Sequence, residues 1–212
     1  MNRVLLTGFG AYAEETDNPS GVIARRFDGA RVEGADVVGR VLPVATEEVR
    51  AVLVEAIDEI RPDVVLVTGV APGRASPAVE RVAINMRDFP IPDIDGNIPI
   101  DRPIDASGPD AYLSTLPIKA IVDGWHSAGI PGYVSNTAGT YLCNQTMYLA
   151  RHLCSARAGM VHLPATPARA AAELPPPPSM SPSDLEESVR LAISVAVTHR
   201  GPDLHLGAGA IS

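Results

Sequence analysis

The sequence has few cysteines, no long apolar run and no excess of positive charge. Its 212 residues contain only two cysteines, too few for a disulfide framework, so we expect reduced thiols in a cytoplasmic protein. No apolar run reaches the length of about 18 residues that a bilayer span needs. The first apolar run, residues 4–6, is too short for the core of a secretory signal. A formal net charge of −8 argues against binding to nucleic acid, which needs clustered Lys and Arg.

What remains is the composition of an ordinary globular protein. Hydrophobic residues make up 46% of the chain and charged residues 20%, unlike the composition of a disordered chain. Glycine (18) and proline (20) together stay below the fraction of about 25–30% that is typical of low-complexity chains. We find no internal repeat and no linker, so we expect a single α/β domain over residues 1–212, with residues 200–212 as a frayed tail.

Strand-like runs alternate with helical patterns, which is typical of a mostly parallel sheet with helices on both faces. We therefore predict a three-layer α/β/α fold with a twisted sheet. Thr46 is a suitable N-cap for a helix that Pro62 ends. The expected strands are residues 4–7, 63–68, 132–135 and 160–163, and further helices are expected from Pro19, over 117–128, over 143–156 and from Ser181.

Two proline-rich segments interrupt this alternation. Residues 88–110 contain five prolines and several turn pairs, which predicts an irregular or hairpin-containing excursion from the sheet. Residues 164–182 are rich in proline and alanine and are expected to form a loop or lid.

The first glycine motif suggests a cofactor site that its context excludes. Residues 8–13 follow a strand and fit the dinucleotide pattern G-x-G-x-x-A. That pattern requires a helix to open at once, so that its N-terminus meets the pyrophosphate. Here Asn18 and Pro19 place the helix start about eight residues later, because proline is tolerated at the first helical position. We therefore expect no cofactor, and a loop that presents Phe9 and Tyr12.

Cys143 follows an expected strand and a polar turn, at the point where a helix begins. A helix N-terminus favours the thiolate form of a cysteine, and its N–H groups can stabilise an oxyanion. The alternative is a cysteine that only fills buried space. Cys154 lies further along the same expected helix, about 16 Å away at 1.5 Å per residue, which is too far for a disulfide. Cys143 is thus the candidate nucleophile, and Cys154 is expected to be structural.

Of the five histidines, only His162 stands on an expected strand that a loop follows at once. If residues 132–135, the helix from Cys143 and residues 160–163 form one right-handed βαβ unit, Cys143 and His162 meet at one edge of the sheet. His162 is then a candidate base, and Glu80 could orient its imidazole. A structural histidine and a solvated glutamate are the alternatives. No spacing of His and Cys resembles a zinc site, so no metal is expected.

The segment 135–144 (SNTAGTYLCN) is the most specific motif in the chain. It resembles the nucleophile signature of the pyroglutamyl peptidase I (pyrrolidone-carboxylate peptidase) family of cysteine peptidases, almost residue for residue. The resemblance runs over nearly the whole chain. Further matching segments are residues 7–9, 18–20, 73–74, 80–85 (ERVAIN), 91–93, 96–97, 162–164 and 178–181.

The resemblance implies an enzyme that removes N-terminal pyroglutamyl (5-oxoproline) residues from peptides through a thioester intermediate, without a cofactor or metal. It implies that Cys143 is the nucleophile, His162 the general base and Glu80 the residue that orients the imidazole. Phe9 and Tyr12 match the family positions that sandwich the lactam ring. Further substrate contacts are expected at Asn18, Val70 and Leu142. The resemblance also implies a homotetramer.

The chain departs from the family pattern at several positions near the expected site. Tyr12 stands where Phe is usual, Val70 where Gln is common and Pro90 where Arg is common. Residues 71–72 also differ, and residues 165–166 replace a more usual aromatic-led run. These departures bear on substrate affinity and ring selectivity. The alternatives to a pyroglutamyl peptidase are a related Cys-dependent amide hydrolase with altered or relaxed specificity, and a catalytically weak binding protein on the same scaffold.

Overall fold

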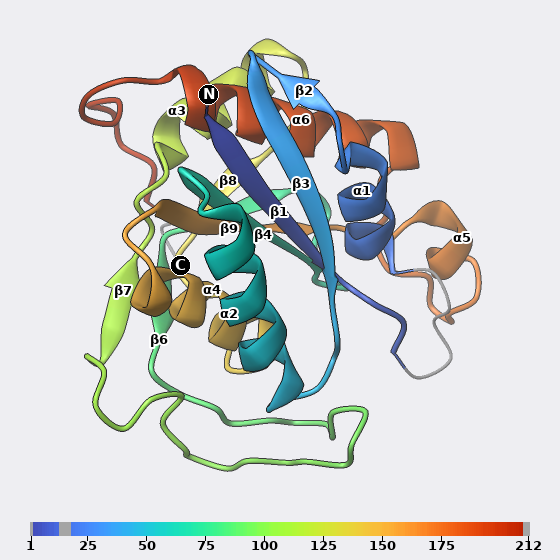
Figure 1. Ribbon diagram of the computed structural model, residues 1–212. Helices are drawn as coiled ribbons and strands as arrows, with labels where there is room; N and C mark the ends of the chain where they lie inside the picture. Colours follow the sequence, from blue (N-terminus) through green and yellow to red (C-terminus); the bar gives the residue numbers. More distant parts are fainter. Residues whose placement is uncertain (1, 13–17, 210–212) are drawn as a thin grey trace.

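The computed structural model describes residues 2–12 and 18–209. Strands and helices alternate along these residues (Figure 1). The strands are β1 (Arg3–Phe9), β2 (Arg31–Val32), β3 (Ala35–Leu42), β4 (Val64–Val70), β5 (Ala78–Glu80), β6 (Val82–Ile84), β7 (Ala111–Leu113), β8 (Tyr133–Ser135) and β9 (Arg157–Leu163). The helices are α1 (Pro19–Phe27), α2 (Glu48–Ile60), α3 (Ile118–Ser127), α4 (Leu142–Leu153), α5 (Pro167–Ala170) and α6 (Pro182–Thr198).

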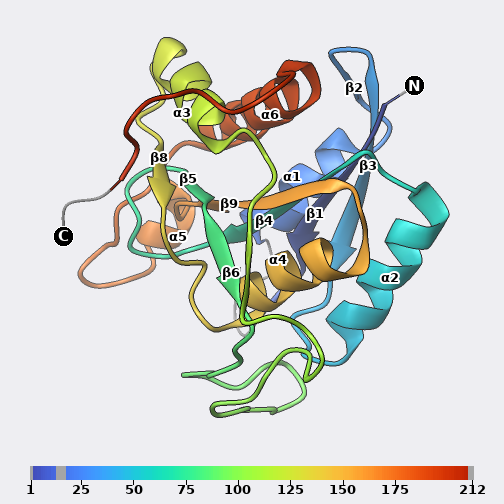
Figure 2. The same ribbon diagram turned by 90° about the vertical axis from the view of Figure 1, so that its left-hand side faces the viewer.

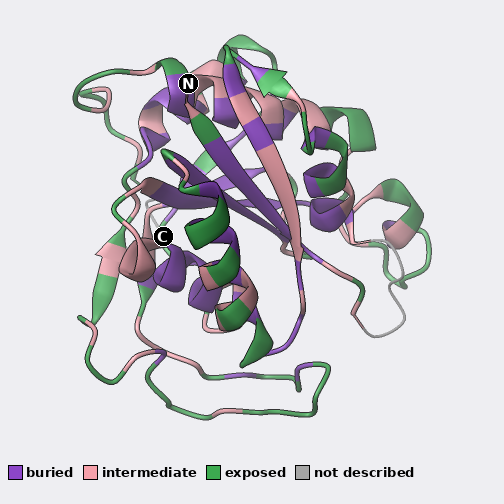
Figure 3. Ribbon diagram, in the orientation of Figure 1, coloured by how far each residue is buried: buried purple, intermediate pink, exposed green. Residues whose placement is uncertain are grey.

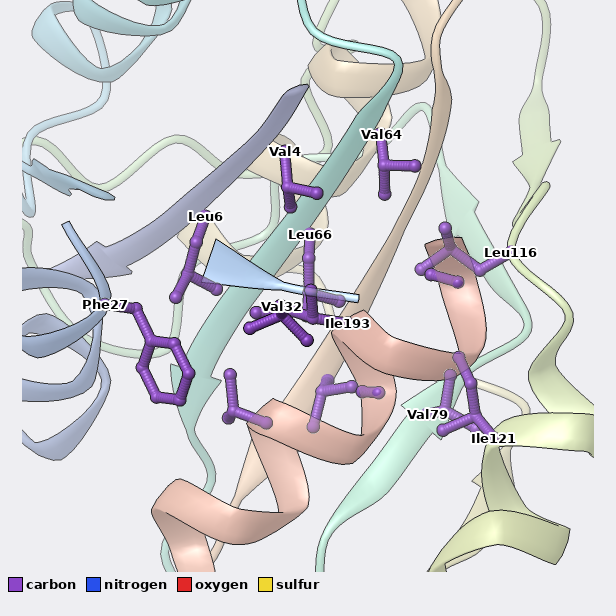
Figure 4. Close-up of a cluster of buried hydrophobic side chains, with 14 of the residues drawn as sticks. Val4, Leu6, Phe27, Val32, Val64, Leu66, Val79, Leu116, Ile121 and Ile193 are labelled. Carbon is purple, nitrogen blue, oxygen red and sulfur yellow. The ribbon is translucent and has the colours of Figure 1, made fainter. Parts of the chain in front are cut away.

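The long helices form two layers, one on each face of the sheet, which confirms the predicted three-layer architecture (Figure 2). Side chains of α1, α3 and α6 pack with Leu6 and Leu66 of the sheet in one buried apolar cluster (Figure 4). Side chains of α2 and α4 pack with Leu5 and Val65 on the other face. Successive residues of β1 and β4 thus point to opposite layers, as a pleated strand requires. Both strands are buried over nearly their whole length (Figure 3).

The main sheet has the strand order β2-β3-β1-β4-β9-β5-β8. The four strands β3, β1, β4 and β9 are parallel. β5 pairs antiparallel with β9 and parallel with β8, so β8 and β9 run in opposite directions. The predicted parallel βαβ unit is therefore wrong, because β5 lies between these two strands and reverses the direction. Residues 136–141 carry the chain back to the carboxyl end of β9, where α4 begins.

Two helix starts agree with the predictions. The Asn18 side chain accepts a hydrogen bond from the Ser20 amide and caps α1, with Pro19 at the first helical position. The Ser181 side chain accepts from the Asp184 amide and caps α6 in the same way. The predicted loop or lid that precedes α6 contains one short helical turn, α5.

Two other helix ends differ from the predictions. The N-cap of α2 is Glu47 and not Thr46, because Thr46 donates both its amide and its hydroxyl to the buried carboxylate of Asp93. α4 ends at Leu153, so Cys154 is its C-cap residue and does not lie within the helix.

Residues 88–110 form the predicted irregular excursion, the long green loop at the bottom of Figure 1. It connects β6 and β7, which pair with each other in a separate antiparallel ribbon. Asp93 anchors the loop through hydrogen bonds from Thr46 and Asn97. Burial alone would raise the pKa of Asp93, but these hydrogen bonds outweigh burial and lower it to about 2.

The predicted frayed tail is wrong for residues 200–209. The Asp203 carboxylate accepts the backbone N–H groups of Lys119 and Ala120 at the start of α3, where a helix has unpaired donors. The Lys119 ammonium also donates to the Leu206 carbonyl. Residues 210–212 lie outside the described part of the chain. None of the helices in the described part is long and apolar enough to cross a bilayer.

Candidate active site

His162 lies near the carboxyl end of β9, in the interior of the sheet. Its neighbours in register are Gly69 on β4 and Ala78 on β5. Both neighbours are small, so they leave space for the imidazole and for a group that packs against it. His162 is only 4% exposed, and a buried imidazole needs polar partners.

Glu80 is one of these partners. Because Ala78 is opposite His162 on an antiparallel neighbour, Glu80, two residues further on, points to the same face and lies diagonally across from His162. The Nδ1–Oε1 distance between His162 and Glu80 is 2.7 Å. The Glu80 carboxylate is fully buried, so it holds the ring with Nε2 directed away from the carboxylate.

Cys143 stands in the first turn of α4, and its sulfur lies over Gly69. A Cβ atom placed on Gly69 would be 2.7 Å from Sγ, so only glycine leaves room for the thiol at this place. Burial alone would lower the pKa of His162, but interactions with Cys143 and with Glu80 outweigh burial and raise it to about 9. The imidazole is therefore protonated at neutral pH and can stabilise a thiolate at Cys143.

A cavity of about 230 Å³ opens beside the Cys143 thiol. Its lining includes Cys143 and the five residues for which substrate contact is predicted: Phe9, Tyr12, Asn18, Val70 and Leu142. His162 interacts with the thiol, and neither His162 nor Glu80 is among the residues that line the cavity. The structure therefore brings all eight predicted site residues into one region. A small, largely apolar cavity with a few polar groups fits a small uncharged ligand.

Tyr141 also lines this cavity, although the sequence pattern carries no signal for it. Its ring packs edge-on against Phe89, with 4.4 Å between the centroids. The hydroxyls of Tyr12 and Tyr141 both donate to the carbonyl of Pro92, at 2.5 and 3.0 Å. Burial, followed by the neighbouring Tyr12, raises the pKa of Tyr141, which keeps its hydroxyl a neutral donor. The two tyrosines thus attach the irregular loop to the cavity wall, where Ile91 completes the lining.

Gly69 and Arg74 are two further residues of the site that residue spacing does not reveal. Gly69 lies beneath the sulfur, and a glycine inside a strand can indicate such a close approach. Arg74 donates from Nη1 to Glu80 Oε1 at 2.8 Å and from Nη2 to the Thr137 carbonyl at 3.2 Å. These contacts depend on the turn between β4 and β5, which the sequence does not define.

Cys154 lies at the opposite end of α4. Its thiol donates to the Ala150 carbonyl at 3.2 Å and packs against the apolar cluster between α2, α4 and the sheet. Both cysteines are free, so no disulfide joins them, as predicted. Over residues 2–12 and 18–209, no group of three or more His, Cys, Asp or Glu side chains is arranged to hold a metal ion.

Comparison with known proteins agrees with this geometry. Residues 2–199 match the family described as pyroglutamyl peptidase. The chain belongs to the pyroglutamyl peptidase family. A pyrrolidone-carboxylate peptidase of Klebsiella pneumoniae (strain 342) is 44% identical to this chain and covers 99% of both sequences. One of Yersinia pestis (strain Pestoides F) is 43% identical over the full length of both.

Solved structures of pyrrolidone carboxyl peptidases have the same fold. The structure from Thermococcus litoralis superimposes with a TM-score of 0.94 at 35% identity, covering 98% of this chain and 100% of that one. The structure of a mutant pyrrolidone carboxyl peptidase from the hyperthermophile Pyrococcus furiosus gives a TM-score of 0.90 at 41% identity, covering 92% and 98%. The family resemblance seen in the sequence is therefore confirmed.

Three of the departures from the family pattern occupy different places. Tyr12 and Val70 line the cavity, and the Tyr12 hydroxyl has a partner in the Pro92 carbonyl. Pro90 is exposed and is not part of the cavity lining. Both neighbours of Pro90 in the sequence lie at the cavity. Phe89 packs against Tyr141, and Ile91 lines the cavity.

Proposed function

We propose that this pyroglutamyl peptidase removes N-terminal pyroglutamyl residues from peptides, with Cys143 as nucleophile. The observation that carries this proposal is the arrangement of one thiol, one imidazole and one carboxylate beside a small cavity. His162 makes the orienting contact with Glu80 at 2.7 Å and interacts with Cys143, which in turn lines the cavity. This is the arrangement that nucleophilic catalysis by cysteine needs.

In the first step, the Cys143 thiolate attacks the carbonyl carbon that links the pyroglutamyl residue to the peptide. The carbonyl oxygen becomes an oxyanion, which N–H groups at the start of α4 can stabilise, since the first amides of a helix have no partner within it. The C–N bond then breaks. The imidazolium of His162 gives its Nε2 proton to the departing amine, and a thioester at Cys143 remains.

In the second step, a water molecule attacks the thioester carbon. Neutral His162 takes a proton from this water, and the C–S bond breaks to release pyroglutamate. The thiolate and the imidazolium are thereby restored. Throughout both steps, Glu80 holds the ring orientation and stabilises its positive charge.

The cavity accounts for recognition of the lactam ring. Phe9 and Tyr12 provide aromatic walls for the two faces of a small, partly apolar ring, while Leu142 and Val70 add apolar contact. Asn18 and Arg169 are polar side chains of the lining that could contact the lactam, although Asn18 Oδ1 already accepts from Ser20. A cavity of about 230 Å³ favours a single small residue over a longer side chain.

Cleavage of a chromogenic pyroglutamyl amide tests this function, with prolyl and glutaminyl amides as substrate controls. We expect cleavage of the pyroglutamyl amide alone, and a loss of at least about 10³-fold in the Cys143→Ser variant. Cys154→Ser is the matched control and should keep its activity, because that thiol lies at the other end of the helix. Undiminished cleavage by Cys143→Ser would contradict the proposal, and equal cleavage of all three amides would indicate relaxed specificity.

We further propose that residues 1–212 act as one domain and that the enzyme is a cytoplasmic homotetramer. The free thiols suit a reducing compartment. Exposed apolar side chains on β7 and the irregular loop support self-association; they include Ile94, Ile98, Ile100 and Leu113. Light scattering after gel filtration should give four times the mass of the chain, and a monomer would contradict this assembly.

A further inference from the structure

The buried carboxylate of Glu80 has an uneven set of partners. Its Oε1 accepts from both His162 Nδ1, at 2.7 Å, and Arg74 Nη1, at 2.8 Å. Its Oε2 is buried without a hydrogen-bond partner in the described part of the chain. A fully buried carboxylate is costly unless it is paired. Arg74 therefore supplies one of the two cationic or polar partners that this buried carboxylate has, and His162 supplies the other.

Arg74 also contacts the segment that leads to the nucleophile. Its Nη2 donates to the Thr137 carbonyl at 3.2 Å, within the loop that carries the chain from β8 to Cys143. One planar guanidinium thus joins the carboxylate and this loop in a fixed geometry, which a flexible ammonium cannot reproduce.

A tight turn places the arginine. Gly73 has a positive φ of 93°, and the Arg74 amide donates to the Ala71 carbonyl at 3.2 Å. This turn directs the chain from the end of β4 toward β5. The Arg74 side chain is 20% exposed, so it reaches Glu80 from the surface side while the carboxylate remains buried.

We propose that Arg74 is a positioning residue for the cysteine–histidine pair. With one arm it holds Glu80 in the orientation that fixes the His162 ring, and with the other it holds the loop in front of Cys143. The assignment rests on the proposed function, because it matters for activity only if this pair performs the reaction.

The charge of Arg74 has a second consequence. A guanidinium near Glu80 offsets part of the field that the carboxylate exerts on the imidazole. Removal of this positive charge should therefore make His162 harder to deprotonate. At an effective dielectric constant of about 20, a charge at this range changes a pKa by about two units. A residue with a merely structural role would change the amount of active enzyme but not the pH at which His162 titrates.

The experiment compares Arg74→Gln, Arg74→Lys and wild type. We expect Arg74→Gln to lower kcat by about 10²-fold and to move the alkaline limb of the pH profile upward by about two units. Arg74→Lys should return this limb to its wild-type position, because the charge is restored, and should recover only part of kcat. Arg50→Gln is the matched control, since Arg50 contacts a different carboxylate, Asp105, at 3.1 Å, and it should change neither quantity.

A direct titration of the His162 imidazole by NMR, without substrate, keeps this inference separate from the proposed function. If the wild type does not cleave pyroglutamyl amides, the proposed function fails, while the imidazole titration still tests the electrostatic role of Arg74. An Arg74→Gln variant with the wild-type imidazole titration and alkaline limb would overturn the inference. If Arg74→Gln does not fold, a fully active Arg74→Lys would overturn the positioning role of Arg74. A lysine ammonium cannot reach both Glu80 and the Thr137 carbonyl in the geometry of the guanidinium.

Discussion

The two ends of α4 carry similar sets of residues in different surroundings. Each end has a cysteine and a histidine, and each histidine approaches a carboxylate that an arginine also contacts. The two sets are His162–Glu80–Arg74 and His152–Asp105–Arg50. Only the first set lies next to a thiol that lines a cavity. Residue types alone therefore do not distinguish an active site from a structural cluster.

Burial and distance separate the two ends. The Glu80 and His162 side chains are 0% and 5% exposed and meet at 2.7 Å. The Asp105 and His152 side chains are 15% and 23% exposed and approach only to 3.6 Å. Hydrogen bonds from Ser107, and then from Arg50, keep the pKa of Asp105 well below its usual value, so this carboxylate is satisfied without its histidine. At the N-terminal end of α4, by contrast, the carboxylate of Glu80 bonds its histidine directly as well as its arginine.

The helix itself adds to the difference. Cys143 stands at the N-terminus of α4, where unpaired backbone N–H groups are available to an oxyanion, whereas Cys154 is the C-cap residue at the end where unpaired carbonyls lie. The thiol of Cys154 instead donates to a backbone carbonyl. At the same end, His152 bonds the hydroxyl of Tyr112 at 2.9 Å and stacks with Tyr148. That end of the helix is therefore built for packing.

Replacement of each histidine in turn gives the largest expected contrast. His162→Gln should lower kcat/KM by at least about 10³-fold, because the general acid and base is lost. His152→Gln should keep activity within about twofold and lower the free energy of unfolding by about 1 kcal/mol, through loss of the bond to Tyr112. Steady-state kinetics and urea unfolding check both variants. A large loss of activity in His152→Gln would remove the distinction between the two ends.

A methyl group added near the N-terminal end of α4 should lower activity, whereas one added near the other cluster should lower stability. In Gly69→Ala, the new Cβ would lie 2.7 Å from the Cys143 sulfur, which displaces the thiol and should lower kcat by about 10²-fold. In Gly108→Ala, the new Cβ would lie 2.1 Å from the Tyr148 hydroxyl. We expect this variant to lose about 1–3 kcal/mol of stability with kcat nearly unchanged. Equal loss of kcat in both variants would contradict this difference.

Much of the site at the N-terminal end of α4 can be predicted from the sequence, although one step of the argument is wrong. Cys143 is identified as a candidate because the residues around it predict a strand, a polar turn and the start of a helix. Its convergence with His162 follows in the sequence argument from a parallel βαβ unit, but β8 runs against β9. A strand of three residues such as β8 carries no information on its direction. The two residues still meet, because the chain after β8 returns to the carboxyl end of β9 before α4 begins.

The contacts between distant segments cannot be predicted in this way. Thr46 has the side chain of a good N-cap, yet it binds Asp93 of the irregular loop, and nothing near Thr46 in the sequence indicates that competition. Arg74 reaches Glu80 and Thr137 only because of the turn after β4. Such polar contacts depend on the final positions of loops, which hydrophobic periodicity does not specify.

The pH dependence should distinguish the two carboxylates. Because the folded-state pKa of His162 is raised to about 9 from about 6.5 in the unfolded chain, its contribution to stability is complete below pH 6.5 and is lost as the pH rises through 9. Activity should fall as the pH rises through about 9, because the general acid of the folded enzyme then loses its proton. In Glu80→Gln we expect the alkaline limb to move to lower pH, since the carboxylate favours the imidazolium.

Asp105→Asn is the matched control for this profile and should leave the alkaline limb in place. Urea unfolding of wild type and His162→Gln at about pH 6, 7.5 and 9.5 tests the stability part. The difference in free energy of unfolding between them should shrink as the pH rises. A difference that stays constant would contradict the assignment of this pH range to His162.

The smallest expected contrast lies between two tyrosine hydroxyls. Tyr12 donates to Pro92 at 2.5 Å beside the cavity, and Tyr112 bonds His152 at the other end of α4. Loss of one neutral hydrogen bond changes a free energy by about 0.5–1.5 kcal/mol, so Tyr12→Phe should raise KM by about 2–10-fold with little change in kcat, because the loop that carries Ile91 is held less firmly. Tyr112→Phe should lower stability by a similar free energy and leave KM unchanged. An unchanged KM in Tyr12→Phe would show that Tyr141, which donates to the same carbonyl at 3.0 Å, holds the loop without help.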